Sequence, residues 1–159
     1  MAQIVEAVNE IYNIDKSLSK KLFLAGGITS CPDWQSEIIE MIKDLPNLIV
    51  YNPRRKDFPI NDPNSAEVQI SWEYEHLRDA DIISFWFSEG SLNPIVLYEL
   101  GRWGNSSNKE IVIGIDPKYE RKKDVIIQTK LSRPDVKIVD SLEELSEEIK
   151  NILIHLKYL

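Results

Sequence analysis

The chain contains little sulfur and little imidazole. Its 159 residues include one cysteine, Cys31, and two histidines, His76 and His155. A single cysteine excludes an internal disulfide bond, which agrees with a reducing compartment. No histidine stands at a recognisable catalytic spacing from Cys31, so a cysteine or serine nucleophile activated by histidine is disfavoured. The ligands of a zinc site are lacking as well, and we expect neither a metal nor a cofactor.

Long hydrophobic runs and clustered positive charge are also missing. No stretch approaches the roughly 18 apolar residues of a membrane-spanning helix, and the first 18 residues lack the apolar core of a signal peptide. The net charge is −7, and the one basic cluster is typical of a solvated helix start: Lys118, Arg121, Lys122 and Lys123. Because binding to a phosphate backbone needs clustered Lys and Arg, we expect no nucleic-acid partner, no membrane partner and a cytoplasmic location.

Short apolar runs alternate with helical patterns along the chain. The runs are rich in Ile, Val, Leu and Phe, which is typical of strands buried on both faces of a parallel sheet. They cover residues 22–25, 48–51, 81–87, 111–115 and 136–139. Helices are expected between and after them, at residues 33–45, 65–79, 94–104, 123–130 and 141–156.

This alternation predicts an α/β fold with a flavodoxin-like five-stranded parallel sheet, strand order 2-1-3-4-5, and helices on both faces. The length fits one domain, with residues 1–20 as an N-terminal helical extension and residues 21–159 as the α/β domain. Ligands bind at the carboxyl ends of the strands in such sheets. The site is therefore expected to form from residues 26–30, 52–55 and 88–93.

Glu99 is the first candidate for chemistry. Asn93 and Pro94 are good helix start signals, because Asn is a favoured N-cap and Pro fits the first helical position. Glu99 then falls in the second turn, between the apolar Tyr98 and Leu100, near a helix N-terminus that points at the cleft. The alternative is an ordinary surface glutamate, which these apolar neighbours make less attractive.

The second candidate is a glutamate within an apolar helical stripe. Residues spaced four, three and four apart share one helix face, and the stripe consists of Ala66, Ile70, Glu73 and Leu77. A buried carboxylate must be paired, hydrogen-bonded or protonated, because removing its charge from water is costly. Two interpretations stay open for Glu73: a buried salt bridge to Arg54 or Arg78, and a second acid in the cleft.

The segments after the first two strands offer further binding residues. Gly26 and Gly27 let the backbone approach a ligand closely, although neither a dinucleotide fingerprint nor a P-loop lysine accompanies them. Thr29 can contact a hydroxyl or a phosphate. The guanidinium fork of Arg54 suits a phosphate, but Arg54 and Arg55 can equally be surface charges.

Three segments together resemble the nucleoside 2-deoxyribosyltransferase-like family: FLAGGITSCPDW, YNPRR and WEYEHLRDADIISFWFSEGSLNPIVLYELGRW, within about residues 22–115. The most specific part is an Ala-Asp pair, here Ala80-Asp81, followed by a helix with a Glu-Leu-Gly triplet, which here begins at Glu99. The resemblance implies that Glu99 is the nucleophile. It also implies that Glu73, eight residues before Asp81, helps to bind and act on the base.

Two positions depart from the family members that transfer deoxyribose. Asn93 stands six residues before the nucleophile, where those enzymes have an aspartate. An asparagine forms hydrogen bonds but cannot donate a proton as an acid. Phe23 stands in the first strand where those enzymes have a tyrosine, so it lacks the hydroxyl that would orient the glutamate. Both side chains are expected in the substrate site.

The resemblance implies cleavage or exchange of the N-glycosidic bond of a (deoxy)nucleoside or nucleotide. A carboxylate captures the anomeric carbon covalently, and a second nucleophile releases the sugar with retention of configuration. A base as second nucleophile makes a transferase, and water makes a hydrolase. Two alternatives stay open: a nucleotide-derivative binding module without efficient turnover, and an NAD or nucleotide-sugar hydrolase. The partner is then a small-molecule nucleoside or nucleotide, and the resemblance implies a homo-oligomer.

Overall fold

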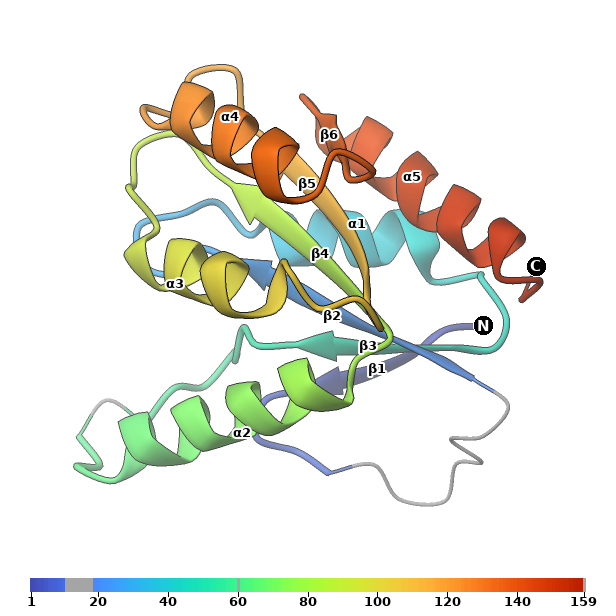
Figure 1. The fold of residues 1–159 in the computed structure, drawn as a ribbon. Helices are drawn as coiled ribbons and strands as arrows, with labels where there is room; N and C mark the ends of the chain where they lie inside the picture. The colour runs from blue at the N-terminus through green and yellow to red at the C-terminus, as the bar shows by residue number, and fades with distance from the viewer. Residues whose placement is uncertain (11–18, 60, 159) are drawn as a thin grey trace.

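The computed structural model describes residues 1–10, 19–59 and 61–158, which form an α/β fold. Six described strands make one parallel sheet in the order β1-β3-β2-β4-β5-β6 (Figure 1). They are β1 Gln3–Glu6, β2 Lys20–Gly26, β3 Leu48–Asn52, β4 Ile82–Phe87, β5 Glu110–Ile115 and β6 Lys137–Val139. The described helices are α1 Trp34–Ile42, α2 Ser65–Asp79, α3 Pro94–Trp103, α4 Lys122–Ser132 and α5 Leu142–His155.

The predicted sheet is confirmed, with one strand added at its edge. When β1 is left aside, the other five strands follow the expected order 2-1-3-4-5. β2 lies between β3 and β4, with Phe23 opposite Tyr51 on one side and opposite Ile83 on the other. All six residues of β4 are buried, as expected for a strand that helices cover on both faces.

The predicted N-terminal helix is wrong for its first residues. Gln3–Glu6 form β1, which pairs in parallel with β3 so that Ile4 lies opposite Val50. The β-branched Ile4 and Val5 favour a strand, and the outer edge of β3 offers backbone groups that would otherwise lack a partner. Residues 11–18 of the predicted helix lie outside the described residues.

Helices cover both faces of the sheet and divide the core into two clusters (Figure 1). One cluster joins the sheet to α2, α3 and α4 through Trp72, Val96 and Val125. The other joins it to α1 and α5, whose buried residues include Ile38 and Ile149. Packing on both faces therefore holds the strands in place. Because β2 and β4 are parallel neighbours, their carboxyl ends lie at the same edge of the sheet.

Half of the stripe predicted on α2 faces inward. Leu77 is 2% exposed and Glu73 is half-buried, whereas Ala66 and Ile70 are exposed, Ile70 with 64% of its surface accessible. The inward side also includes Ser65, Gln69, Trp72 and His76. The polar Gln69 and His76 turn inward because each has a backbone partner. The Gln69 amide donates to the Pro53 carbonyl at 2.8 Å, and the His76 ring contacts the Trp72 carbonyl at 2.8 Å.

Two glycine substitutions test this packing in opposite directions. A Cβ at Gly26 would collide with the Trp34 ring and lie 2.9 Å from the Trp86 carbonyl oxygen. Gly26→Ala is therefore expected to lower the free energy of unfolding by about 1–3 kcal/mol, as overpacking does. Gly101→Ala in α3 meets no atom within 4 Å, and it should raise that free energy by up to about 1 kcal/mol because alanine favours helix. Chemical denaturation measures both, and equal effects would contradict the packing described.

Candidate active site

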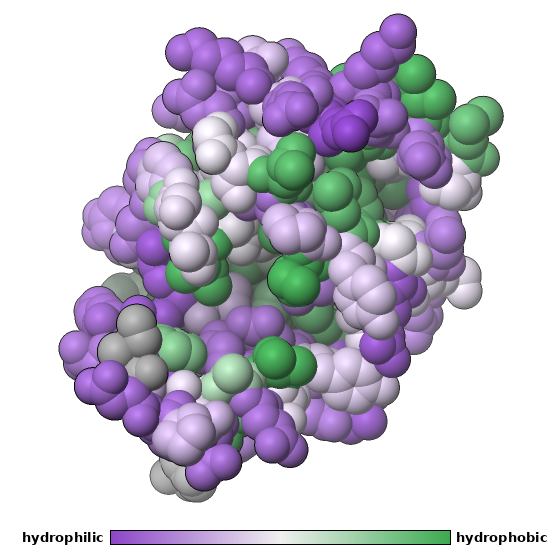
Figure 2. All heavy atoms as spheres, turned by 90° about the vertical axis from the view of Figure 1, so that its left-hand side faces the viewer, coloured by the Kyte–Doolittle hydropathy of each residue, from purple (hydrophilic) through white to green (hydrophobic). Residues whose placement is uncertain are grey.

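A cavity of about 350 Å³ lies at the carboxyl ends of β2 and β3. Figure 2 looks onto this side of the molecule and shows a hollow flanked by hydrophobic residues. Its walls come from β2 and the following loop, from the end of β3, from α2 and from the start of α3. The described lining residues are Phe23, Ala25, Gly26, Gly27, Ile28, Thr29, Pro53, Glu73, Ser91, Asn93, Pro94, Ile95, Val96 and Glu99.

Two carboxyl groups line this cavity, and the protein environment raises the pKa of both. Burial raises the pKa of Glu99 to about 8, and the negative charge of Glu73 adds to that shift. Burial also raises the pKa of Glu73, while a hydrogen bond from Gln69 offsets part of the shift. Two like-charged carboxyl groups in one partly buried site favour a state in which the pair keeps a proton, and the larger shift falls on Glu99.

Gln69 orients Glu73 toward the cavity although it does not line the cavity itself. Its Nε2 donates to the Pro53 carbonyl at 2.8 Å and to Glu73 Oε1 at 2.7 Å. A backbone carbonyl can only accept a hydrogen bond, so the amide nitrogen must face Pro53 and Glu73. The donated hydrogen bond favours the charged form of Glu73 over its protonated form.

The salt-bridge interpretation of Glu73 is not what the structure displays. Arg54 pairs with Asp33 at 3.2 Å, and Arg78 pairs with Glu75 on the exposed side of α2. No described basic residue forms an ion pair with Glu73. Its hydrogen-bond partner is the neutral Gln69. Glu73 thus lines the same cavity as Glu99 without a basic partner among the described residues.

Arg54 does not line the cavity, in contrast to the expectation of a phosphate ligand. Its Nε donates to Gln35 Oε1 at 2.9 Å. Its Nη2 lies within 3.4 Å of the carbonyl oxygens of Ile28, Cys31 and Pro32. These contacts commit the guanidinium group to bracing the loop that follows β2.

Asn93 precedes α3 as predicted, but its side chain does not cap the helix. Its backbone is left-handed, with φ 49°, a conformation that Asn tolerates better than most residues. Its Nδ2 donates to the carbonyls of Ser88 and Ser91, and its Oδ1 accepts from the Cys31 thiol at 3.4 Å. The amide group therefore ties the loop after β4 to the loop after β2.

The paired glycines serve packing between these loops. A Cβ at Gly27 would collide with the Asn93 amide and the Cys31 sulfur, and the Trp34 indole donates to the Gly27 carbonyl at 3.1 Å. Gly26 is crowded by the Trp34 ring in the same way. Because the two glycines have no side chains, Trp34, Cys31 and Asn93 can pack directly against their backbone. Both glycines also form part of the cavity wall.

The structure brings seven of the eight predicted site residues to one lining: Phe23, Gly26, Gly27, Thr29, Glu73, Asn93 and Glu99. Phe23 is 1% exposed, and its ring packs 6.2 Å from that of Trp72. Sequence reasoning missed Pro53 and Ser91, although both stand in the segments expected to form the site. It also missed Gln69, whose only signal is its position four residues before Glu73.

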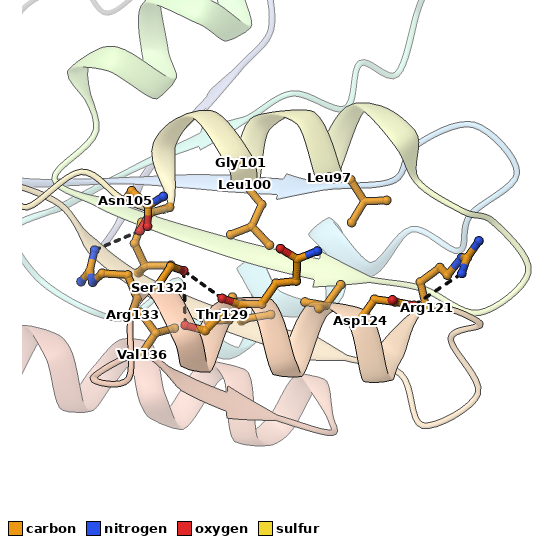
Figure 3. Close-up of a pocket in the computed structure, with 15 residues that line it drawn as sticks. Leu97, Leu100, Gly101, Asn105, Arg121, Asp124, Thr129, Ser132, Arg133 and Val136 are labelled. Atoms are coloured by element: carbon orange, nitrogen blue, oxygen red, sulfur yellow. Dashed lines mark hydrogen bonds and ion pairs between the residues drawn. The ribbon is translucent and has the colours of Figure 1, made fainter.

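A second cavity, of about 470 Å³, lies between α3 and α4 (Figure 3). Leu97 and Leu100 extend from α3 toward α4 across it. Asp124 is the one carboxylate of its described lining, and it pairs with Arg121 at 3.5 Å. This cavity lacks the two carboxylates with raised pKa, so the chemistry is expected in the cavity that holds Glu73 and Glu99.

The described residues contain no group of three or more His, Cys, Asp or Glu side chains placed to hold a metal ion. None of the helices in the described part of the chain is long and apolar enough to cross a membrane.

Comparison with known proteins identifies one family. A family model described as nucleoside 2-deoxyribosyltransferase like matches residues 19–119. No curated protein matches the chain. The matched stretch is more than half of the chain, and it contains every described residue that lines the cavity of Glu73 and Glu99.

The raised pKa of Glu99 predicts a pH dependence of stability. The folded protein keeps the Glu99 proton between the ordinary value of 4.5 and about 8, whereas the unfolded chain loses it. This group therefore lowers the free energy of unfolding as pH rises through that window. Glu99→Gln should remove the effect and be more stable than the wild type at about pH 9, by about 1 kcal/mol or more.

Denaturation of both proteins at about pH 4 and about pH 9 measures this difference. Glu75→Gln is the matched control, because Glu75 lies on the exposed side of α2 outside the cavity of Glu73 and Glu99. A stability gap between wild type and Glu99→Gln that does not change with pH would contradict the burial of an ionisable Glu99.

Proposed function

Because the chain belongs to the nucleoside 2-deoxyribosyltransferase-like family, we propose that it breaks the N-glycosidic bond of a nucleoside, with Glu99 as the nucleophile. The observation that carries this proposal is the pair of carboxylates, Glu73 and Glu99, in one cavity at the carboxyl edge of the sheet. Two carboxylates around a scissile bond are the usual equipment of retaining glycosidic chemistry.

The reaction proceeds in two displacements. A carboxylate oxygen of Glu99 attacks the anomeric carbon, and the C–N bond breaks so that its electron pair leaves with the base. The sugar is then held as an ester of Glu99. Water or a second base attacks the same carbon from the opposite face, which frees the carboxylate and retains the configuration.

Glu73 helps to bind the nucleobase and activates the incoming nucleophile. Gln69 holds its carboxyl group in place, and its raised pKa lets it accept a proton from attacking water near neutral pH. Glu99 must be ionised to attack, and its pKa of about 8 makes the attacking form the minor one in the empty cavity at neutral pH. The rate of the first displacement therefore depends on the fraction of Glu99 that is ionised.

One observation favours the binding module as a second candidate function. The Asn93 amide is committed to Ser88, Ser91 and Cys31, so it offers a departing base no proton. A module that binds a nucleoside without cleaving it needs no such acid. Turnover separates the two functions, whereas the homo-oligomer and the cytoplasmic location stay predictions of the sequence.

Removal of the nucleophile tests the proposed chemistry directly. Glu99→Ala should abolish release of free base by a factor on the order of a thousand or more, because a covalent nucleophile is lost. Glu99→Gln keeps the shape, removes the charge and should be similarly inactive. Chromatography of free base measures the loss, and the mass of one sugar on trapped wild-type protein supports the ester. Turnover of Glu99→Ala near the wild-type rate would remove Glu99 from this role.

The pH dependence of catalysis gives a second test. Since Glu99 attacks as a carboxylate, kcat/KM for an uncharged nucleoside should rise with pH and level off above about 8. Glu73→Gln removes the like charge beside Glu99, so the midpoint of this rise should move to lower pH. A profile that is flat from about pH 5 to about pH 9 would show that ionisation of Glu99 does not limit the reaction.

A further inference from the structure

The described residues that line the cavity carry negative charge only. Glu73 and Glu99 are its ionisable groups, and no Lys, Arg or His is among the described lining residues. Arg54 directly follows the lining residue Pro53 in the sequence, but its guanidinium group braces the loop after β2 and pairs with Asp33. The cavity therefore favours a cation and repels an anion. Water screens charges only weakly in a partly buried site, so these interactions are stronger there than in bulk solvent.

Resting on the proposed function, we propose that the cavity takes nucleosides whose base carries a positive charge and whose sugar carries no phosphate. Such substrates are N-ribosyl pyridinium compounds and nucleosides of N7-alkylated purines. In both, the glycosidic nitrogen belongs to a cationic ring. The proposal narrows the substrate class of the same site in which Glu99 is the nucleophile.

The leaving group supplies the first argument. An uncharged purine or pyrimidine leaves as an anion unless an acid protonates it. Asn93 cannot act as an acid, and Glu73, whose charged form the Gln69 hydrogen bond favours, serves in the proposed reaction as the base for water. A cationic base takes the electron pair of the broken C–N bond and leaves as a neutral molecule without any proton. Water then forms the new bond to the sugar and passes its proton to Glu73 and to solvent. One proton is therefore released for each substrate hydrolysed.

The protonation of the empty cavity supplies the second argument. A positive charge within about 4–6 Å of a carboxyl group favours its ionised form. A bound cationic base would thus lower the pKa of Glu99 from about 8. Protonated Glu99 would then lose its proton and become the attacking carboxylate. An uncharged nucleoside adds further desolvation without this compensation, and it leaves Glu99 protonated.

The size of the cavity supplies the third argument. Its volume of about 350 Å³ is at the lower end of the roughly 300–1,000 Å³ that small-molecule sites occupy. A nucleoside suits that volume better than a dinucleotide does. A phosphate would also have to approach Glu73 and Glu99 with no basic residue in the described lining to pair with it.

Matched pairs of substrates isolate the charge. Nicotinamide riboside is a cation, and 1,4-dihydronicotinamide riboside has nearly the same shape without the charge. 7-Methylguanosine and guanosine form a second pair. For each substrate, kcat/KM is divided by the rate constant of its cleavage without enzyme. We expect this ratio to be larger for the cation by a factor on the order of a hundred. Nicotinamide mononucleotide, which adds a phosphate, should be at least about tenfold poorer than nicotinamide riboside.

Binding gives a readout that does not need turnover. Calorimetry with Glu99→Gln should show that nicotinamide riboside binds about tenfold more tightly than its dihydro form, a difference of about 1.4 kcal/mol. Adding Glu73→Gln to that variant should remove the preference, because it removes the remaining carboxylate. Adding Glu75→Gln instead should leave the preference unchanged, since Glu75 lies on the exposed side of α2 outside this cavity.

The outcomes separate this inference from the proposed function. Equal normalised cleavage of charged and uncharged partners, abolished by Glu99→Ala, would overturn the charge preference and leave the nucleophile in place. Tighter binding of the cation that depends on Glu73, without any base release, would support the preference and overturn the chemistry. Failure to bind or cleave any member of either pair would overturn both.

Discussion

The burial of two like-charged groups in one cavity is the constraint on which the rest of the site depends. Two carboxylates that both lost their protons there would repel each other and lack full hydration, so the pair keeps a proton. The two glutamates come from different helices, Glu73 from α2 and Glu99 from α3. They stay together because Trp72 and Val96 anchor those helices to the same face of the sheet. The core thus supplies the free energy that an unfavourable electrostatic arrangement requires.

Most of the polar groups around the cavity stabilise its walls. Arg54 holds the loop after β2 through its backbone carbonyls, and Asn93 links that loop to the one after β4. Gly27 permits this close approach, since a side chain there would displace Asn93. A wall that is already hydrogen-bonded to itself loses little conformational entropy when a ligand binds. The cavity is therefore pre-organised, and Glu73 and Glu99 are the ionisable groups of its described lining.

The sequence predicted the elements better than it predicted their contacts. Uninterrupted apolar runs identified five strands, because both faces of β2, β3 and β4 are covered. β1 was missed because four residues beside polar neighbours resemble a helix start as much as an edge strand. Part of the inward face of α2 was missed because Gln69 and His76 are polar and Ile70 is exposed. The role of Arg54 was missed because it depends on carbonyl groups, which every residue has and which composition does not reveal. Glu73 and Glu99 were singled out by their apolar neighbours in the sequence and by the family resemblance, although several of those neighbours, such as Ile70 and Tyr98, are exposed.

The residue at position 93 bears on the ionisation of Glu99, because it shares the cavity lining with both glutamates. A carboxylate at position 93 would place a third negative group on the lining that Glu73 and Glu99 already share, and it would raise the pKa of Glu99 further. An amide of nearly the same shape avoids that repulsion and supplies donors to Ser88 and Ser91. Asparagine at position 93 thus leaves Glu99 easier to ionise than an aspartate would, and it supplies no acidic proton. In the proposed reaction this combination suits a leaving group that needs no proton.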